Sequence, residues 1–523
     1  MKGFLQQLGF LFAITLNVVQ IQAQDNRQSL YQIIDAQSKR PVIYATVILK
    51  QAQRGVISDD NGNFRIPNLY KIDHDTLRIS CIGFKTRLVP LKSQKNDLIN
   101  SIELFPKTES LEEVTLVHKK NKKHISPGRV VKEAIKRIPE NYPVKPFSYL
   151  GYYRDYQQVA DNSYLDNTDI TANNKYINLN EGIIQVFDAG FGTDRLINDA
   201  NQTVLYEFQK NKNFPMDVML TVPYDNRKEK YLDGVIITPL GGNELNLLNL
   251  TNAIRNYNRM SFSFAHVFNR HFLGNHIFTH NGITYMDDEP IYRIQFILNQ
   301  HDTKPGYNAT GSVFISKEDF GIHRLNYKLY DTRSKKLLYR IKMEYKKQAG
   351  RYYLNYITFN NYFKVKSEDY FKVEEINYDL ESSCFYFYFN ESIASPVDKN
   401  PDKYIRFFID KKEIKILAIQ IIEPKVLKIK ISSSIEIDKS IFNKEITYEI
   451  KHLKDVHGRL INKPEEVLAD QFREFFVQEV FPNKSVELDK EFVKKNSPLN
   501  QSRSHALDGK DIYWINTPLK VNK

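Results

Sequence analysis

The sequence predicts a mostly β protein of several domains, with only a few short helices. Three observations support this prediction. The chain contains 32 Tyr and 33 Phe residues, and aromatic residues favour strands. Short alternating segments bounded by turn residues recur along most of the chain, which is typical of sandwiches and antiparallel sheets. Its 523 residues correspond to roughly three or four domains of ordinary size.

The N-terminus has the order of features found in a secretory signal peptide. Lys2 supplies a positive charge, residues 8–19 form an apolar run, and Ala23 offers a small residue for cleavage. The run is shorter than the about 20 residues of a membrane-spanning helix, although an uncleaved anchor is the alternative. We therefore expect residues 1–23 to be removed. The mature protein is then exported to the periplasm or cell surface, where it could associate with the outer membrane through a peripheral contact.

Charge and cysteine content exclude several classes of protein. The formal charge of +12 comes from 74 basic and 62 acidic residues that are spread through the predicted strands. Because no nucleic-acid-binding module accompanies them, nucleic acid is not expected as a partner. Cys81 and Cys384 are the only cysteines, and they allow one long-range disulfide or, as we favour, two buried free thiols. Two distant cysteines form neither a disulfide framework nor a zinc ribbon.

Residues 24–118 are predicted to form a small β-sandwich that folds on its own. The Asn61-Gly62 pair lies between strand-like flanks and is a strong signal for a hairpin turn. Short strands separated by turns are typical of a small sandwich. The predicted strands lie at residues 30–34, 43–49, 76–79 and 86–90.

The same segment resembles a carboxypeptidase regulatory-like domain, which is a transthyretin-like β-sandwich. The resemblance is carried by the stretches KRPV, ATV, GVISDDNGNF and LRISCIGFKT within residues 28–116. It implies an accessory module without chemistry of its own, attached in other proteins to zinc carboxypeptidases, to TonB-dependent receptors or to envelope proteins. None of the 12 histidines has a glutamate three positions later, and HExxH is absent. The zinc enzyme that such a module accompanies is therefore not recognisable in this chain.

Two groups of side chains have the composition of a metal site but not its spacing. Asp59, Asn61 and Asn63 alternate as in a calcium loop, but Phe64 and Tyr70 occupy the positions where an EF-hand needs Gly and Glu. A turn is therefore the better interpretation of these residues. The second group lies close to Asp287, Asp288 and Glu289, but its spacing suits no single helix or strand face, so we predict no metal site. It consists of His266, His271, His276 and His280.

Residues 119–146 are predicted to form a basic linker followed by a short helix. The Lys-rich run at residues 118–124 is short and lacks apolar residues, as in a solvated linker. A basic patch for anionic lipid or polysaccharide is the alternative. Ser126 and Pro127 begin the helix as its cap and first-turn proline, and apolar residues between 130 and 138 share one face.

Residues 147–381 are predicted to form a central antiparallel β region. The glycines of residues 182–192 do not form a phosphate-binding loop, because the G-x-G-x-x-G pattern and a following helix are missing. The stretches YMDDEPIYRIQF and ATGSVFISKEDFGIHRL resemble hairpins of outer-membrane lipoprotein-carrier-like folds. This resemblance implies a half-barrel, in which a curved sheet would hold an acyl chain.

The last third of the chain is predicted to contain a second sandwich, over residues 382–463. Its opening stretch CFYFYF and its closing stretch DVHG are similar to those of bacterial immunoglobulin-like domains. Residues 464–523 are predicted to form an amphipathic helix, over residues 464–480, and a polar tail. The residues expected on the apolar side of this helix are Leu468, Phe472, Phe475 and Phe476.

We interpret the chain as a non-catalytic, exported envelope protein with a binding or scaffolding role. No nucleophile elbow or metal motif is recognisable, so we assign no catalytic, cofactor-binding or metal-binding residue and no cofactor. We expect the body, residues 125–481, to bind an envelope protein or glycan, with the first domain as an appended handle; the oligomeric state stays open. The alternatives are a carrier of lipid or small molecules, which needs an apolar cavity, and a hydrolase with converging carboxylates.

Overall fold

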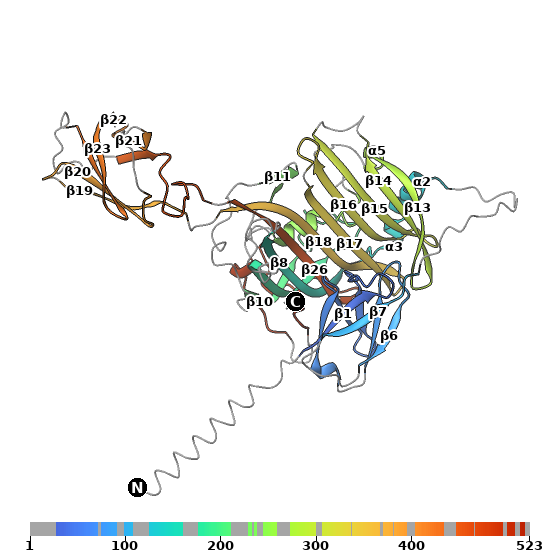
Figure 1. The fold of residues 1–523 in the computed structure, drawn as a ribbon. Coiled ribbons are helices and arrows are strands. Elements are labelled where there is room, and N and C mark those ends of the chain that lie inside the picture. The colour runs from blue at the N-terminus through green and yellow to red at the C-terminus, as the bar shows by residue number, and fades with distance from the viewer. Residues whose placement is uncertain are drawn as a thin grey trace, which may run out of the picture.

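The computed structural model describes most of the chain between Gln28 and Thr517 (Figure 1). The predicted signal peptide, the Lys-rich run, His266 and His271 lie outside the described residues. No helix among the described residues is long and apolar enough to cross a membrane. The described residues are 28–71, 75–91, 99–107, 125–159, 176–210, 229–232, 235–237, 244–258, 272–299, 306–335, 337–366, 370–379, 381–394, 403–432, 446–464, 466–494, 499–507 and 513–517.

The fold class predicted from the sequence is confirmed, because strands dominate the described residues and the helices are short. The larger sheets form three parts: a first domain, a central sheet of ten strands and a sandwich near the C-terminal end. A separate pair joins β11 (Glu229–Leu232) to β12 (Val235–Ile237).

Two small sheets form the first domain, with a 3-10 turn, η1 (Asn68–Lys71), after the fourth strand. Their alternating apolar side chains meet in one core that includes Ile33, Val47 and Leu77. One sheet consists of β4 (Asn63–Pro67), β1 (Gln28–Asp35) and β7 (Asn100–Leu104). The other consists of β3 (Arg54–Ile57), β2 (Thr46–Leu49), β5 (Thr76–Ser80) and β6 (Arg87–Pro90).

The turn at Asn61-Gly62 is present, but it is not the predicted hairpin. It connects β3 to β4, which belong to different sheets. The Asp59 carboxylate accepts hydrogen bonds from the backbone N–H groups of Asn61 and Asn63, so it closes the turn from within. Gly62 has a φ of 73°, and a Cβ there would lie 2.5 Å from the carbonyl oxygen of Ile33. The local signal therefore predicted the turn correctly and the pairing of its flanks wrongly.

The central sheet is antiparallel throughout and follows the order β10-β9-β8-β26-β18-β17-β16-β15-β14-β13. Its ten strands include nine that lie within the predicted central β region, residues 147–381, and β26, which lies outside it. They are β8 (Phe147–Val159), β9 (Tyr176–Asp188), β10 (Thr203–Lys210), β13 (His276–Met286), β14 (Glu289–Leu298), β15 (Tyr307–Ser316), β16 (Ile322–Asp331), β17 (Leu337–Gln348), β18 (Arg351–Lys366) and β26 (Glu466–Phe481).

The predicted helix over residues 464–480 is wrong, because this segment is β26 and pairs with β8 and β18 inside the central sheet. Every residue from 470 to 478 is buried. Phe475 packs in the core on one face of the sheet, whereas Phe476 packs against the first domain on the other face. A strand covered on both faces loses the period-2 pattern, so its aromatic spacing resembled that of a helix.

The second sandwich is an insertion between β18 and β26, and Figure 1 shows it projecting from the body. Its first strand, β19 (Val373–Asp379), lies within the predicted central region, so the boundary at residue 381 was too late. Its core contains Phe385, Phe387 and Phe407. The other strands are β20 (Cys384–Phe389), β21 (Ile405–Ile409), β22 (Lys412–Ile414), β23 (Ile416–Glu423), β24 (Val426–Ile431) and β25 (Ile446–Ile450).

The helices pack on one face of the central sheet. The predicted helix after Ser126 is confirmed as α2 (Pro127–Lys136), with Val130, Val131 and Ala134 buried, although the Ser126 side chain makes no capping hydrogen bond. Residues of α2, α4 and α5 share a core with one face of the sheet strands. The other helices are α3 (Ile138–Asn141), α4 (Glu244–Thr251) and α5 (Phe272–Asn275), and a 3-10 turn, η9 (Leu499–Gln501), lies near the C-terminus.

Candidate functional site

The first domain covers the face of the central sheet opposite the helices. Tyr44 and Ile57 of this domain share an apolar cluster with sheet residues that include Leu150, Tyr356 and Phe476. Figure 1 shows the domain, in blue, against the strands of the sheet. The prediction that it is an appended handle was therefore wrong. The contact includes apolar side chains of the first domain. The alternating pattern of a strand shows that one side faces its own sandwich, but it does not show whether another domain covers the other side.

A buried ion pair lies under the first domain. Arg154 on β8 and Glu474 on β26 both have fully buried side chains, and the Arg154 guanidinium donates a hydrogen bond to the Glu474 carboxylate. The Tyr44 hydroxyl, from the first domain, donates a second hydrogen bond of 2.9 Å to the other carboxylate oxygen. Burial, with the charge of Glu474, raises the pKa of Tyr44 well above its usual value, so Tyr44 stays a donor.

The β13–β14 turn holds the first domain from another side. Asp287 accepts hydrogen bonds from Arg78 and Thr86, and Lys107 forms an ion pair of 2.8 Å with Asp288. Asp287 and Asp288 were noted in the sequence as neighbours of the histidine group. Their role in the structure is to bind the first domain to the central sheet.

The C-terminal tail connects the two parts a third time. Trp514 packs into the core of the first domain, and its indole N–H donates to the carbonyl oxygen of Arg65 at 3.1 Å. The amide of Gln478 on β26 bonds the backbone of Trp514, donating to its carbonyl oxygen at 2.6 Å and accepting from its N–H at 3.3 Å. Asn516 bonds Arg65 N–H and the carbonyl oxygen of Ile57. The end of the chain is thus part of the interdomain contact.

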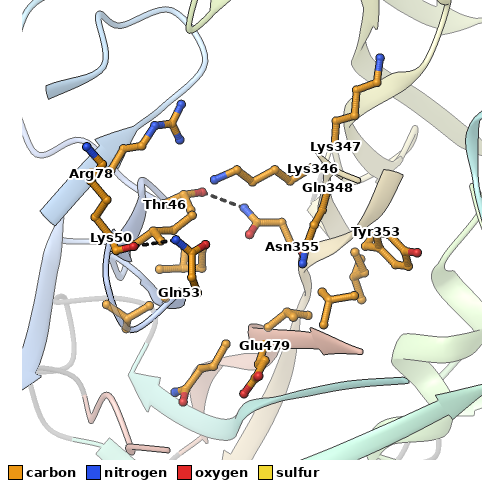
Figure 2. Close-up of a pocket in the computed structure, with 18 residues that line it drawn as sticks. Thr46, Lys50, Gln53, Arg78, Lys346, Lys347, Gln348, Tyr353, Asn355 and Glu479 are labelled. Atoms are coloured by element: carbon orange, nitrogen blue, oxygen red, sulfur yellow. Dashed lines mark hydrogen bonds between the residues drawn. The ribbon is translucent and has the colours of Figure 1, made fainter. Parts of the chain in front are cut away.

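A cavity of about 360 Å³ lies between these contacts (Figure 2). The first domain contributes β2, β3 and Arg78 to its wall, and the central sheet contributes the end of β17, the start of β18 and the end of β26. We call this space the interdomain cleft. Its labelled polar and charged lining residues are Thr46, Lys50, Gln53, Arg78, Lys346, Lys347, Gln348, Tyr353, Asn355 and Glu479.

Most charges of the interdomain cleft have partners. Glu479 forms an ion pair with Arg54 at 3.3 Å and accepts a hydrogen bond from the Tyr513 hydroxyl. Lys347 forms an ion pair of 2.6 Å with Asp319, and Figure 2 shows it pointing away from the cleft. Lys346 differs from these groups. Its amino nitrogen is buried and has no hydrogen-bond partner among the described residues.

Comparison with known families confirms the family predicted for the first domain. Residues 32–116 match the family model of the CarboxypepD_reg-like domain. The first domain is a carboxypeptidase regulatory-like domain. No curated protein matches the chain. The interdomain cleft therefore lies between a regulatory-like domain and the sheet on which it is docked.

Several solved structures resemble part of the chain at low identity and low TM-score. They include a LolA superfamily protein from Nitrosomonas europaea, with 11% identity and a TM-score of 0.18. A putative outer membrane lipoprotein-sorting protein domain from Vibrio parahaemolyticus has 11% identity and a TM-score of 0.19. A DUF1329 family protein from Desulfovibrio piger has 8% identity and a TM-score of 0.18. Each comparison covers 45% of this chain and at least 85% of the other.

Lys346 lies in the part of the cleft wall that the central sheet contributes. It lies near the end of β17 and pairs with Tyr353 on β18, just after an irregularity in the register at Glu344 and Tyr345. Burial, and after it the positive charge of Arg78, lowers the pKa of Lys346 to about 8. Lys342, four residues earlier on the same strand, also has its pKa lowered to about 8, first by burial and then by Arg340.

We expect Lys346 to contribute more stability to the protein as the pH rises from about 8 to about 10. An unfolded lysine has a pKa of about 10.4, so in this window the unfolded state binds more protons than the folded state. The contribution of Lys346 to the free energy of unfolding therefore rises with pH, by on the order of 1–3 kcal/mol, and it is read as the difference between the parent and a variant that lacks this amine. Denaturant unfolding at several pH values measures this slope.

The Lys346→Met variant should be more stable than the parent near pH 7 and should show a smaller slope. Lys430→Met, at an exposed position on β24, is the matched control and should leave the slope unchanged. Equal slopes in all three proteins would contradict the assignment of a buried, partly neutral Lys346.

The face of the sheet that carries the helices has small cavities among the described residues. The three cavities there have volumes of about 10, 20 and 30 Å³. Leu247 and Leu248 of α4 pack on the sheet at this place. Asp188, next to the smallest of the three, is bound by Arg255 at 2.9 Å and by Arg195 at 3.7 Å.

The histidine and cysteine residues noted in the sequence do not converge. His276 is a core residue, because its ring lies near Phe272 and Tyr327 and burial lowers its pKa to about 4. No group of three potential ligands for a metal ion occurs in the described parts of the chain. Cys81 and Cys384 are buried and free, as favoured from the sequence. Lys346 was missed, because a lysine near the end of a strand normally points into water.

Proposed function

We propose that this protein is an exported, non-catalytic envelope protein that binds a small ligand in the interdomain cleft. The observation that carries the proposal is a 360 Å³ space that both domains line and that contains the unpartnered amino group of Lys346. Cavities of about 300–1,000 Å³ are typical of small-molecule sites. The walls are strands of two sheets, and sites built on such elements are better defined than sites on loops.

The lining of the cleft supports binding more than catalysis. Its described residues include no Ser, Cys or His, which are the usual nucleophiles and general bases. Glu479, the one carboxylate of the lining, is held by Arg54 and Tyr513. The export signal predicted at residues 1–23 and the regulatory-like domain support a place in the envelope, where a protein or glycan could present the ligand.

Native mass spectrometry of the full mature chain after incubation with an envelope extract tests the proposal. We expect an added mass on the parent protein and its loss in Gln348→Trp, because the indole fills the cleft at the end of β17. Gln420→Trp, on an exposed position of β23 in the inserted sandwich, is the matched control and should keep the added mass.

The outcomes separate the alternatives. Loss of the added mass in both tryptophan variants, or in neither, would overturn the cleft as the binding site. An added mass that has the composition of a lipid and persists in Gln348→Trp would instead favour the carrier alternative.

A further inference from the structure

The cleft holds a positive charge that the described protein does not neutralise. Glu479 and Lys347 have the partners given above, and Arg78 forms an ion pair with Asp287. Lys346 has none among the described residues, although its amino nitrogen is buried. Burying a polar group without a hydrogen bond is unfavourable, and burying a charged one is more so. A ligand that accepts hydrogen bonds and carries negative charge would remove this cost.

The basic and acidic side chains of the cleft lie toward opposite ends of it. In Figure 2 the side chains of Lys50, Arg78 and Lys346 lie toward one end, and Glu479 lies at the other. The Asn355 amide, between them, donates hydrogen bonds of 2.8 Å to Thr46 and to Glu344, which fixes its position. One end of the cleft is thus cationic and lined by fixed groups, as in sites that bind anions.

We propose that the ligand of the interdomain cleft is a small anion with a carboxylate or phosphate group, and that Lys346 binds this group. The inference rests on the proposed function, because it names the ligand class of the same cleft. The volume suits a small organic acid or a phosphorylated small molecule. Lys346 supplies up to three donors from a buried amino nitrogen, and a charge-assisted hydrogen bond to an anion is strong.

Binding should be coupled to protonation of Lys346. Its pKa is lowered to about 8, so the free protein is partly neutral there, and an anion at the amino group raises that pKa again. Carboxylates and guanidinium groups have ordinary pKa values far from 8, and so does an ordinary lysine. Proton uptake near pH 8 is therefore expected from Lys346, which lines the cleft, and not from Lys342, which has a similar pKa but does not line it. The charged groups that face it from the surrounding elements are Lys50, Arg78, Asp287, Glu344 and Glu479.

Isothermal titration of the full mature chain with inorganic phosphate, and separately with succinate, tests the inference. At about pH 8, titrations in two buffers of different ionisation enthalpy should show uptake of about half a proton per bound anion. Affinity should fall roughly tenfold per pH unit above this value, because the amine loses its charge. Comparing the two anions tells a phosphate source from a carboxylate source.

Lys346→Met should weaken binding roughly tenfold to a hundredfold and abolish the proton uptake. Lys430→Met, far along the chain on the inserted sandwich, should change neither. The melting temperature of Lys346→Met shows that the variant is folded, and we expect it to equal or exceed that of the parent near pH 7.

Binding of neither anion by the parent, or undiminished binding by Lys346→Met, would overturn the inference. The proposed function fails separately, since it requires that Gln348→Trp removes the ligand from envelope extract. If that variant loses its ligand while phosphate and succinate do not bind, the cleft binds a neutral ligand and only the anion is wrong.

Discussion

Replacing Glu474 by alanine is expected to lower the free energy of unfolding by about 3–5 kcal/mol, because removing one partner of a buried ion pair leaves an uncompensated charge. The remaining partner, Arg154, has a fully buried side chain and is not able to reach water without disrupting the interface. The Tyr44 hydroxyl also loses its acceptor, and this bond joins the regulatory-like domain to the central sheet. Thermal and denaturant unfolding of the full chain measure the change.

An exposed ion pair on the inserted sandwich provides the control. Arg406 and Glu413 both have side chains about half exposed, and Glu413→Ala should change the stability little, because solvent screens the pair. The double variant Arg154→Met with Glu474→Leu should recover part of the lost stability, because neither charge of the pair is then left buried without the other. A Glu474→Ala variant no less stable than Glu413→Ala would contradict the buried pair.

Replacing Trp514 by alanine should destabilise the regulatory-like domain by about 3–5 kcal/mol, because a large aromatic side chain leaves a cavity in its core. Trp514 is 4% exposed and packs near Tyr70. It is also the only tryptophan of the chain, so its fluorescence in the parent protein reports directly on release of the tail. Circular dichroism melts of parent and variant measure the loss of stability.

Two further variants separate packing from other effects. Trp514→Phe keeps an aromatic ring but loses the hydrogen bond to Arg65, so it should cost only about 1–2 kcal/mol. Leu488→Ala, at a position 85% exposed, should be neutral. If Trp514→Ala melts at the temperature of the parent, the tail does not complete the core of the domain. These results also bear on whether the domain folds alone, since an excised domain lacks Trp514.

Local signals explain the elements that the sequence predicted correctly. The Asn61-Gly62 turn depends on the freedom of glycine at positive φ, and α2 begins where Pro127 suits a first turn. The alternation in residues 384–389 reflects one buried and one partly exposed face, as the strand has in the structure. Each of these features depends on residues close together in the chain, which is why sequence alone predicts it.

Segments covered on both faces could not be predicted in the same way. The aromatic spacing of β26 fits a helix as well as a strand, and its burial comes from α-helices on one side and the regulatory-like domain on the other. The predicted pairing of the two strands that flank Asn61-Gly62 was wrong for a related reason. Which strands pair depends on the whole domain and not on the turn between them.

By itself, the sequence determined the β class, the regulatory-like domain, the turn at Gly62 and the helix after Ser126, because short-range periodicity and backbone preference decide these features. Only the tertiary structure decided that β26 completes the central sheet, that Trp514 closes the first domain, and that Lys346 is buried in a cleft. These features join residues hundreds of positions apart. Their cause is the burial of apolar surface between domains, and neither local pattern nor composition encodes which surfaces meet.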